Sequence, residues 1–330
     1  MARILPWLGI ALLAAAPLLG LGNYPLHLLI MVLLWGYVYT GWSIMGRLGM
    51  VSFGHGAFLG IGAYVVVMGW NHYGLTPWMG VPIALAVTAI VAFLIGYPCF
   101  RYKIVGHYFA LVTLALSEVT RLLIVALRDQ TGGSLGVTPK TALADASFSL
   151  FALQFSSKLV WFYVVLGFWL AGLWVWKKVD QSMGRLALEA ISQEEDASAS
   201  IGINVTRLKL GVTMISALMT CLGGVLYAQY QLYVNPETVS GIGISLQMVF
   251  GVIAGGMYVR LGPTVGAAFT LLLAEGLRLW FGNRFHALDT TVYGLMLVLF
   301  IIYMPKGILG AATEALAKPR RQPESGRATA

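Results

Sequence analysis

Residues 183–209, MGRLALEAISQEEDASASIGINVTRLK, are the most informative stretch of the chain, because they are charged and helix-forming and lie between two apolar stretches. Several side chains in this stretch cost too much free energy to lie in hydrocarbon, namely Arg185, Glu189, Glu194, Glu195 and Asp196. Apolar residues still recur at roughly helical spacing, which predicts a single helix lying at the water interface. Gly202 stands where a helix C-cap needs a left-handed residue, and Asn204 can cap the next helix. A helix joined in this way to a membrane helix is suited to act as a lever moved by a soluble partner.

The remaining sequence is that of a polytopic membrane protein. Of the 330 residues 58% are hydrophobic and only 10% are charged, against about 25% charged in ordinary soluble domains. Ten apolar stretches are candidate spans, and most approach the ~20 residues that a spanning helix needs, with Ser245–Val259 as the short one. They are Leu5–Leu21, Leu26–Met45, Ser52–Trp70, Met79–Tyr97, His107–Leu127, Leu159–Trp176, Leu208–Gln229, Ser245–Val259, Thr264–Gly282 and Leu288–Met304. We therefore predict an all-α fold with about ten transmembrane helices.

The positions of the 21 Lys and Arg residues predict the orientation of these helices. With a cytoplasmic N-terminus, only Arg128, Lys140, Lys158 and Arg284 fall in outside segments, and Arg121 and Arg278 fall within spans. All other basic residues fall in inside segments, as the positive-inside rule requires for an even number of spans with both ends cytoplasmic. The net charge of +8 is thus explained by an anionic inner leaflet, and nucleic-acid binding is not needed to account for it.

The same pattern divides the chain. Residues 1–310 form one predicted transmembrane domain, with residues 178–207 as its main cytoplasmic loop and residues 128–158 as its longest periplasmic loop. Residues 311–330 are basic, polar and aperiodic, which predicts a disordered cytoplasmic tail. The first span resembles a signal peptide, but Pro17 would follow the cut directly, so we expect an uncleaved helix. Cys99 and Cys221 are predicted to be buried free thiols.

Catalytic and nucleotide-binding motifs are missing from the sequence. The glycine cluster Thr131–Gly136 is followed by no Lys-Ser or Lys-Thr pair, so it is not a phosphate-binding loop. The five histidines, His27, His55, His72, His107 and His286, show no metal-binding spacing. We expect no metal and no cofactor on this chain, and any ATP hydrolysis would belong to another subunit.

Small and charged residues within the spans suggest other sites. Glycines such as Gly60 and Gly255 allow close helix packing, whereas Gly54-His55-Gly56 is a candidate helix interruption on a substrate path. A structurally satisfied His55 is the simpler interpretation. The intramembrane charges fall in two groups spaced three apart, Glu118 with Arg121 and Glu275 with Arg278. They are interpreted as locally paired charges, with an ion or proton relay as the alternative.

Six sequence blocks resemble the permease subunits of branched-chain amino acid ABC transporters, the LivM-type subunit in particular. They are Gly46–Tyr64, Gly106–Ala115, Thr131–Ser134, Gly184–Ile191, Ser200–Lys209 continuing into Gly223–Tyr227, and Gly255-Gly256 with Gly262–Ala267. The resemblance covers roughly residues 30–310. Ser192-Gln193 departs from the family, in which a basic-acidic pair is usual, and Leu135 replaces a usual polar residue.

The resemblance implies an ABC importer transmembrane domain in the bacterial inner membrane. It implies as partners a second, LivH-type permease, two cytoplasmic ATPases that carry ATP and Mg²⁺, and a periplasmic binding protein. Glu189, Ala190 and Gly202 match the family's coupling motif, which docks on the ATPase, and Glu194 and Glu195 are added as candidate contacts. The cargo implied is a branched-chain amino acid or a related amide, urea or aromatic acid.

Two further expectations complete the analysis. His55, Tyr64, Tyr108 and Thr113 are the candidate residues lining the translocation path. The main alternative function is an ion-coupled secondary transporter with Glu118 or Glu275 as its coupling carboxylate. An integral membrane enzyme is disfavoured because the histidines are scattered.

Overall fold

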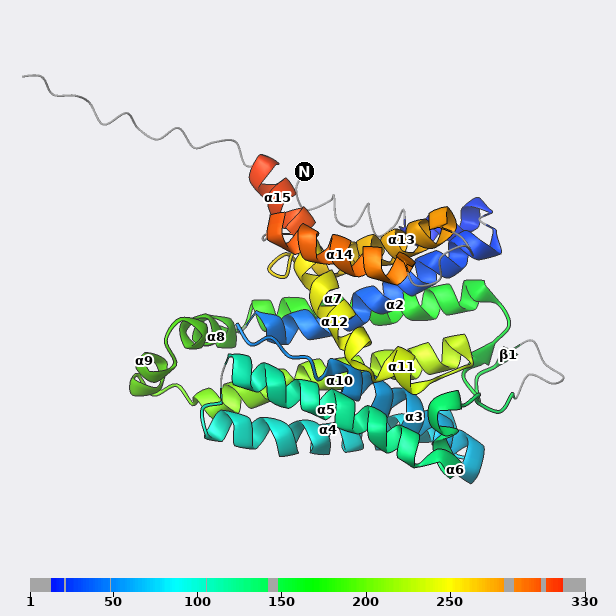
Figure 1. The fold of residues 1–330 in the computed structure, drawn as a ribbon, viewed down its shortest axis with the longest axis horizontal. Helices are drawn as coiled ribbons and strands as arrows, with labels where there is room; N and C mark the ends of the chain where they lie inside the picture. Colours follow the sequence, from blue (N-terminus) through cyan, green and yellow to red (C-terminus); the bar gives the residue numbers. More distant parts are fainter. Residues whose placement is uncertain are drawn as a thin grey trace, which may run out of the picture.

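A computed structural model describes residues 13–20, 22–47, 49–104, 106–141, 148–281, 288–303 and 307–316. Within these ranges the chain is mostly helical, and most of its long helices lie side by side along one direction, whereas α12 crosses them at a steep angle (Figure 1). The long helices are α2 (Asn23–Gly46), α3 (His55–Tyr73), α4 (Pro77–Arg101), α5 (His107–Ala126), α7 (Lys158–Asp180), α10 (Val205–Gln231), α12 (Ile242–Gly255), α13 (Gly262–Phe281) and α14 (Leu288–Tyr303). The shorter elements are η1 (Ala16–Leu19), α6 (Arg128–Thr131), η2 (Gly133–Leu135), α8 (Met183–Gln193), α9 (Glu195–Ser200), α11 (Pro236–Val239) and α15 (Gly307–Leu316).

Nine of the ten predicted spans overlap one of the long helices. Among the described residues, six helical segments are long and apolar enough to cross a membrane: α2, α4, α5, α7, α10 and Pro236–Gly255. The predicted count of about ten spanning helices stays a prediction, since α14, for example, has only 16 residues. Of the first predicted span, Leu5–Leu21, only residues 13–20 are described, and they include η1.

The structure also refines the predicted loops. The segment after α5 contains one antiparallel pair of two-residue strands, β1 (Phe148–Ser149) and β2 (Gln154–Phe155), so the described fold is not purely helical. Val137 forms a β-bridge with Val234 at the far end of α10. α15 continues to Leu316, six residues into the predicted tail, and residues 317–330 lie outside the described part of the chain.

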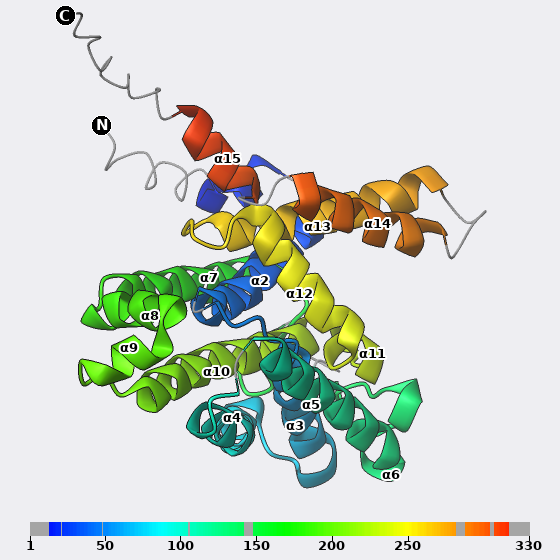
Figure 2. The same cartoon turned by 60° about the vertical axis from the view of Figure 1, so that its left-hand side comes forward.

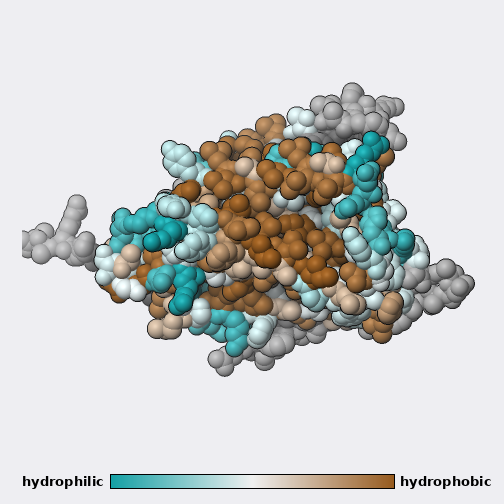
Figure 3. Space-filling view, turned by 90° about the horizontal axis from the view of Figure 1, so that it is seen from below, coloured by the Kyte–Doolittle hydropathy of each residue, from teal (hydrophilic) through white to brown (hydrophobic). Residues whose placement is uncertain are grey.

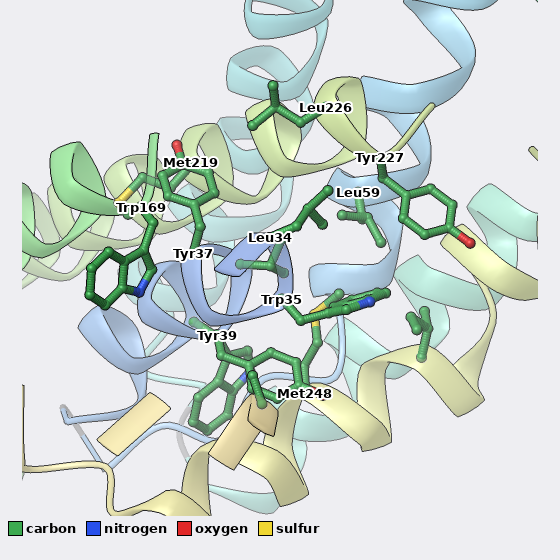
Figure 4. Close-up of a cluster of buried hydrophobic side chains, with 14 of the residues drawn as sticks. Leu34, Trp35, Tyr37, Tyr39, Leu59, Trp169, Met219, Leu226, Tyr227 and Met248 are labelled. Atoms are coloured by element: carbon green, nitrogen blue, oxygen red, sulfur yellow. The ribbon is translucent and has the colours of Figure 1, made fainter. Parts of the chain in front are cut away.

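Helix α2 forms the centre of the molecule. Its second half is buried almost without interruption, because α7, α10, α12 and α13 pack around it. A helix that is enclosed on every side must be apolar on every side, and α2 carries Leu34, Trp35 and Tyr37 on different faces. Figure 4 shows these side chains meeting Met219 of α10, Trp169 of α7 and Met248 of α12.

Glycines allow the closest helix contacts in this core. A Cβ added at Gly62 of α3 would collide with the carbonyl oxygen of Cys221 on α10. One added at Gly224 of α10 would collide with the carbonyl oxygen of Leu59. Gly255 and Gly262 make a similar close contact between α12 and α13. The packing interpretation of the membrane glycines is therefore confirmed at Gly62 and Gly255.

The remaining helices lie on two sides of this centre. Figure 2 shows α13, α14 and α15 on one side of α2 and α12, with α3, α4 and α5 on the other. The face of the bundle seen in Figure 3 carries a band of apolar residues, with hydrophilic residues gathered at both ends. Exposed residues of α4, such as Ile90 and Leu94, contribute large apolar surfaces. Cys99 and Cys221 are buried free thiols, as predicted.

Residues predicted on the same side of the membrane meet at the same end of the bundle. At one end, Arg47 pairs with Asp180, and Lys103 pairs with Asp196. At the other end, the Asn71 side-chain amide donates to the carbonyl oxygen of Thr138 at 2.8 Å. Helices α8 and α9 lie at the first of these ends, and β1 and α6 lie at the second (Figure 1).

Candidate functional site

The interfacial segment consists of two helices and not of the single helix predicted from its sequence. α8 ends at Gln193, and Glu194 adopts an extended conformation with φ −151° and ψ 103°. Its carbonyl oxygen then accepts hydrogen bonds from the backbone N–H and the hydroxyl of Ser198. Glu195 and Asp196 occupy the first turn of α9, where the helix dipole favours negative charge. The acidic run therefore starts a new helix and breaks the preceding one.

The predicted C-cap at Gly202 and the predicted N-cap at Asn204 are confirmed. Gly202 has φ +91°, its N–H donates to the carbonyl of Ala199, and the N–H of Ile203 donates to that of Ser198. This hydrogen-bond pattern is that of a Schellman C-cap. The Asn204 side chain then accepts the N–H of Arg207 at 3.0 Å and caps α10. The chain is thus fixed in direction where it enters the next long helix.

Helix α8 is strongly amphipathic, with one face on the bundle and one in solvent. Leu188 and Ile191 are buried against the ends of the long helices. Met183 and Leu186 are 84% and 63% exposed, and Ile201 beyond α9 is 77% exposed. Glu189 is exposed, and Ala190 is partly buried. The segment therefore presents apolar and acidic groups together to the outside.

Ion pairs attach the segment to the long helices on both sides. On the α10 side, the Glu195 carboxylate lies 2.5 Å from the Lys209 ammonium, which is only 3% exposed. On the α7 side, Asp180 accepts from Arg47 at 2.7 Å and lies 3.7 Å from Arg185. Sequence reasoning did not identify the Glu195–Lys209 pair. The costly position of Lys209 at the start of a span was the available signal that it needs a partner.

The predicted docking residues therefore differ in their surroundings. Glu189 is bound by Arg185 on its own helix at 2.8 Å. Glu195 stabilises the fold through Lys209, whereas the Glu194 side chain is exposed and forms no ion pair with any described residue. Of the two acids added as candidate contacts, Glu194 is the one whose charge is free to meet a partner.

Two further contacts involve charged side chains at the same end of the bundle as α8 and α9. The exposed Lys103 hydrogen-bonds Asp196 at 2.5 Å, which lowers the pKa of the Asp196 carboxyl and raises the pKa of the Lys103 ammonium. The guanidinium of Arg47 lies 3.4 Å above the ring of Trp176. Burial lowers the pKa of Arg47 to about 10, which leaves it charged at neutral pH.

The candidate path residues do not share one surface. His55, Tyr64 and Thr113 are buried, whereas Tyr108 is exposed. The His55 ring lies 2.7 Å from the Ser216 hydroxyl, so its polar groups are satisfied inside the fold. The Thr113 hydroxyl accepts the N–H of Phe53 and fixes the chain before α3. Their participation in a path stays a prediction.

The two intramembrane charge groups also differ from each other. Arg121 forms the predicted ion pair with Glu118 and has a second partner, Glu237 of α11, at 2.7 Å. That second carboxylate was not anticipated from sequence. In the other group, no ion pair between Glu275 and Arg278 is found among the described residues. Glu275 instead accepts the Tyr24 hydroxyl at 2.6 Å. Across the described chain, no three His, Cys, Asp or Glu side chains are grouped as metal ligands would be.

Comparison with known proteins decides the family. The family described as the permease component of the branched-chain amino acid transport system matches residues 24–301. The chain belongs to this permease family. With its apolar helices, the permease is a multi-pass membrane protein.

Individual relatives agree with this assignment. LivM of Salmonella typhimurium is 29% identical over 304 residues, which cover 86% of this permease and 68% of the relative. LivM of Escherichia coli is 30% identical over 285 residues, which cover 81% of this permease and 65% of the relative. The permease thus spans about two thirds of these two relatives. A probable LivH of Methanocaldococcus jannaschii is 23% identical over 315 residues, which cover 87% of this permease and 95% of that relative. No solved structure matches.

Proposed function

We propose that this permease is a translocation subunit of an ATP-driven, binding-protein-dependent importer in the bacterial inner membrane. Its cargo would be a branched-chain amino acid or a related small solute such as an amide, urea or an aromatic acid. The branched-chain amino acid is drawn from the names of its relatives, which are branched-chain amino acid transport permeases, and the other solutes rest on the sequence resemblance alone.

The α8–α9 segment is the observation that carries this proposal. It combines a buried face, ion pairs to α7 and α10, and solvent-exposed apolar side chains at Met183, Leu186 and Ile201. Exposed apolar residues beside charged ones are typical of a protein-binding surface. The partner that fits is a cytoplasmic ATPase, which would seat the exposed side of α8 in a groove.

The proposed assembly has four kinds of subunit. Relatives of both the LivM and the LivH type support pairing with a second permease. Two ATPases would bind ATP and Mg²⁺ on the cytoplasmic side, and a periplasmic binding protein would deliver the solute. This chain itself would carry no nucleotide.

Motion would pass from the ATPase through the fixed ends of the segment. A displacement of α8 is transmitted to α7 through Asp180 and Arg185, which lie 3.7 Å apart. A displacement of α9 is transmitted to α10 through Glu195 and Lys209. The long helices would tilt and change the side to which the path opens.

An ion-coupled secondary transporter fits these residues less well. Its candidate carboxylates already have partners, since Glu118 binds Arg121 and Glu275 accepts from Tyr24. A coupling carboxylate must exchange its proton or ion during transport, and a fixed ion pair hinders that exchange.

The test places a charge on the exposed face of α8. Leu186→Glu leaves the buried face intact, so the complex should insert normally, while ATP-driven uptake should fall by about thirtyfold or more, as expected for a lost interface anchor. The matched control is Leu150→Glu, which changes an exposed leucine (57%) at the opposite end of the bundle. Uptake at the wild-type rate in the Leu186 variant would overturn the proposal.

A further inference from the structure

A cavity of about 300 Å³ lies at the end of the bundle opposite to α8 and α9. It is formed where α2 and α7 begin and where α10 ends, next to β2. Its walls include His27, Gln154, Lys158, Trp161, Gln229 and Tyr230. The volume is at the lower limit for pockets that hold small molecules.

Gln229 is the most unusual residue in this cavity. The residue is only 2% exposed, yet neither its amide oxygen nor its amide nitrogen has a hydrogen-bond partner among the described residues. Leaving a buried polar group unpaired costs free energy, and here both a donor and an acceptor are unpaired. A ligand with one acceptor and one donor close together would satisfy both atoms.

The electrostatics of the cavity favour a negative group. Lys158 is the first residue of α7, a helix of 23 residues, and its N-cap Ser157 forms no side-chain cap. The first N–H groups of such a helix and the Lys158 ammonium both attract an anion. The described lining residues include no carboxylate. Glu275, whose charge acts on the nearby His27, is already bound by Tyr24.

An apolar wall completes the cavity. The ring of Trp161 packs edge-on against Phe155 and Tyr230, with centroids 5.3 and 5.5 Å away. His27 lies 2.5 Å from the Tyr230 hydroxyl, which fixes the position of that ring. Aromatic walls beside a few fixed polar groups are typical of sites for small amphiphilic molecules.

We propose that this cavity binds a small α-amino acid with an apolar side chain. The carboxylate would accept from Lys158, the start of α7 and the Gln229 amide nitrogen, the ammonium would donate to the Gln229 amide oxygen, and the side chain would lie against Trp161 and Tyr230. This inference rests on the proposed function and assigns that function a solute site within this subunit.

The experiment measures equilibrium binding of labelled L-leucine to the purified transporter complex in nanodiscs, without its binding protein. Competitors separate the two charged groups of the ligand: 4-methylpentanoate keeps the carboxylate and isopentylamine keeps the amine. We expect 4-methylpentanoate to compete at least tenfold better than isopentylamine, because the carboxylate makes the charge-assisted contacts.

Two variants and one control test the residues. Lys158→Gln and Gln229→Leu should each weaken L-leucine binding about tenfold or more, and Gln229→Leu should keep or raise the melting temperature because it removes an unpaired amide. Lys140→Gln removes an exposed ammonium from the same end of the molecule, outside the cavity, and should leave Kd unchanged.

The outcomes separate this inference from the proposed function. If both variants bind L-leucine as wild type does, or if isopentylamine competes as well as 4-methylpentanoate, the proposed amino-acid site in this cavity is refuted. If the complex with its binding protein still imports leucine in that case, the proposed function stands without this site. If the two variants lose binding as expected, the site is confirmed.

Discussion

Lys209 shows how a single charge is accommodated at the start of a membrane helix. It is almost fully buried and depends on Glu195, from the preceding short helix, for its counter-charge. The acids lie together between two long helices, as their sequence spacing predicts, but which of them pairs with Lys209 could not be predicted from sequence. Which acid meets Lys209, 14 residues away, is fixed by the break at Glu194 and the turn at Gly202.

Glu195→Gln should therefore destabilise the permease. Breaking a fully buried pair costs roughly 3–5 kcal/mol, and we expect less here because Glu195 is 20% exposed. Thermal unfolding in detergent measures the change. Glu195→Gln combined with Lys209→Met should recover much of the loss, because no buried charge is then left unpaired. A melting temperature unchanged in the single variant would contradict the assigned role.

The exposed Asp196–Lys103 pair should be insensitive to pH near neutrality. Lys103 lowers the pKa of Asp196 below its ordinary value of 3.8. A lowered carboxyl pKa gives a contribution that is present above the ordinary value and is lost as pH falls through the lowered one. The melting-temperature difference between wild type and Asp196→Asn should be small and constant from pH 5 to 8 and should shrink below about pH 4. A change centred near pH 6.5 would point to a histidine instead.

At the scale of elements, the long helices were predictable and the short ones were not. Hydropathy places a spanning helix well because a run of apolar residues has no other stable environment. The break at Glu194, the β1–β2 pair and the extension of α15 to Leu316 depend on local capping and on contacts between distant segments. The glycine pattern predicted close packing, but only the structure shows which helices meet.

The α3–α10 contact should tolerate no added methyl group. Gly224→Ala places a Cβ against the Leu59 carbonyl, so the helices must separate, which costs about 1–3 kcal/mol or more. A Cβ added at Gly211 on the same helix meets no described atom within 4 Å. Gly211→Ala should therefore be neutral or stabilise the fold by about 0.5–1 kcal/mol. Thermal unfolding of the two variants compares them directly, and equal melting temperatures would contradict the assigned contact.

At the scale of the whole molecule, the two ends of the bundle have different characters. One end has the amphipathic α8–α9 segment held by ion pairs, and the other has the β1–β2 pair and the polar cavity at Gln229. The distribution of basic residues predicted which loops share an end, and the contacts among those loops agree. Charge counting could not predict the cavity, because its polar groups come from three separate helices and a strand.

Site-specific cross-linking from α8 to the ATPase in the assembled complex tests the central claim most directly. A cysteine at Leu186 should cross-link to the ATPase in inside-out vesicles, and a cysteine at Leu150 should not, because it lies at the opposite end. The native Cys99 and Cys221 are buried and should give little background. A cross-link from position 186 that changes with ATP is the predicted result. Absence of any link from position 186, or a link from position 150 instead, would contradict the account.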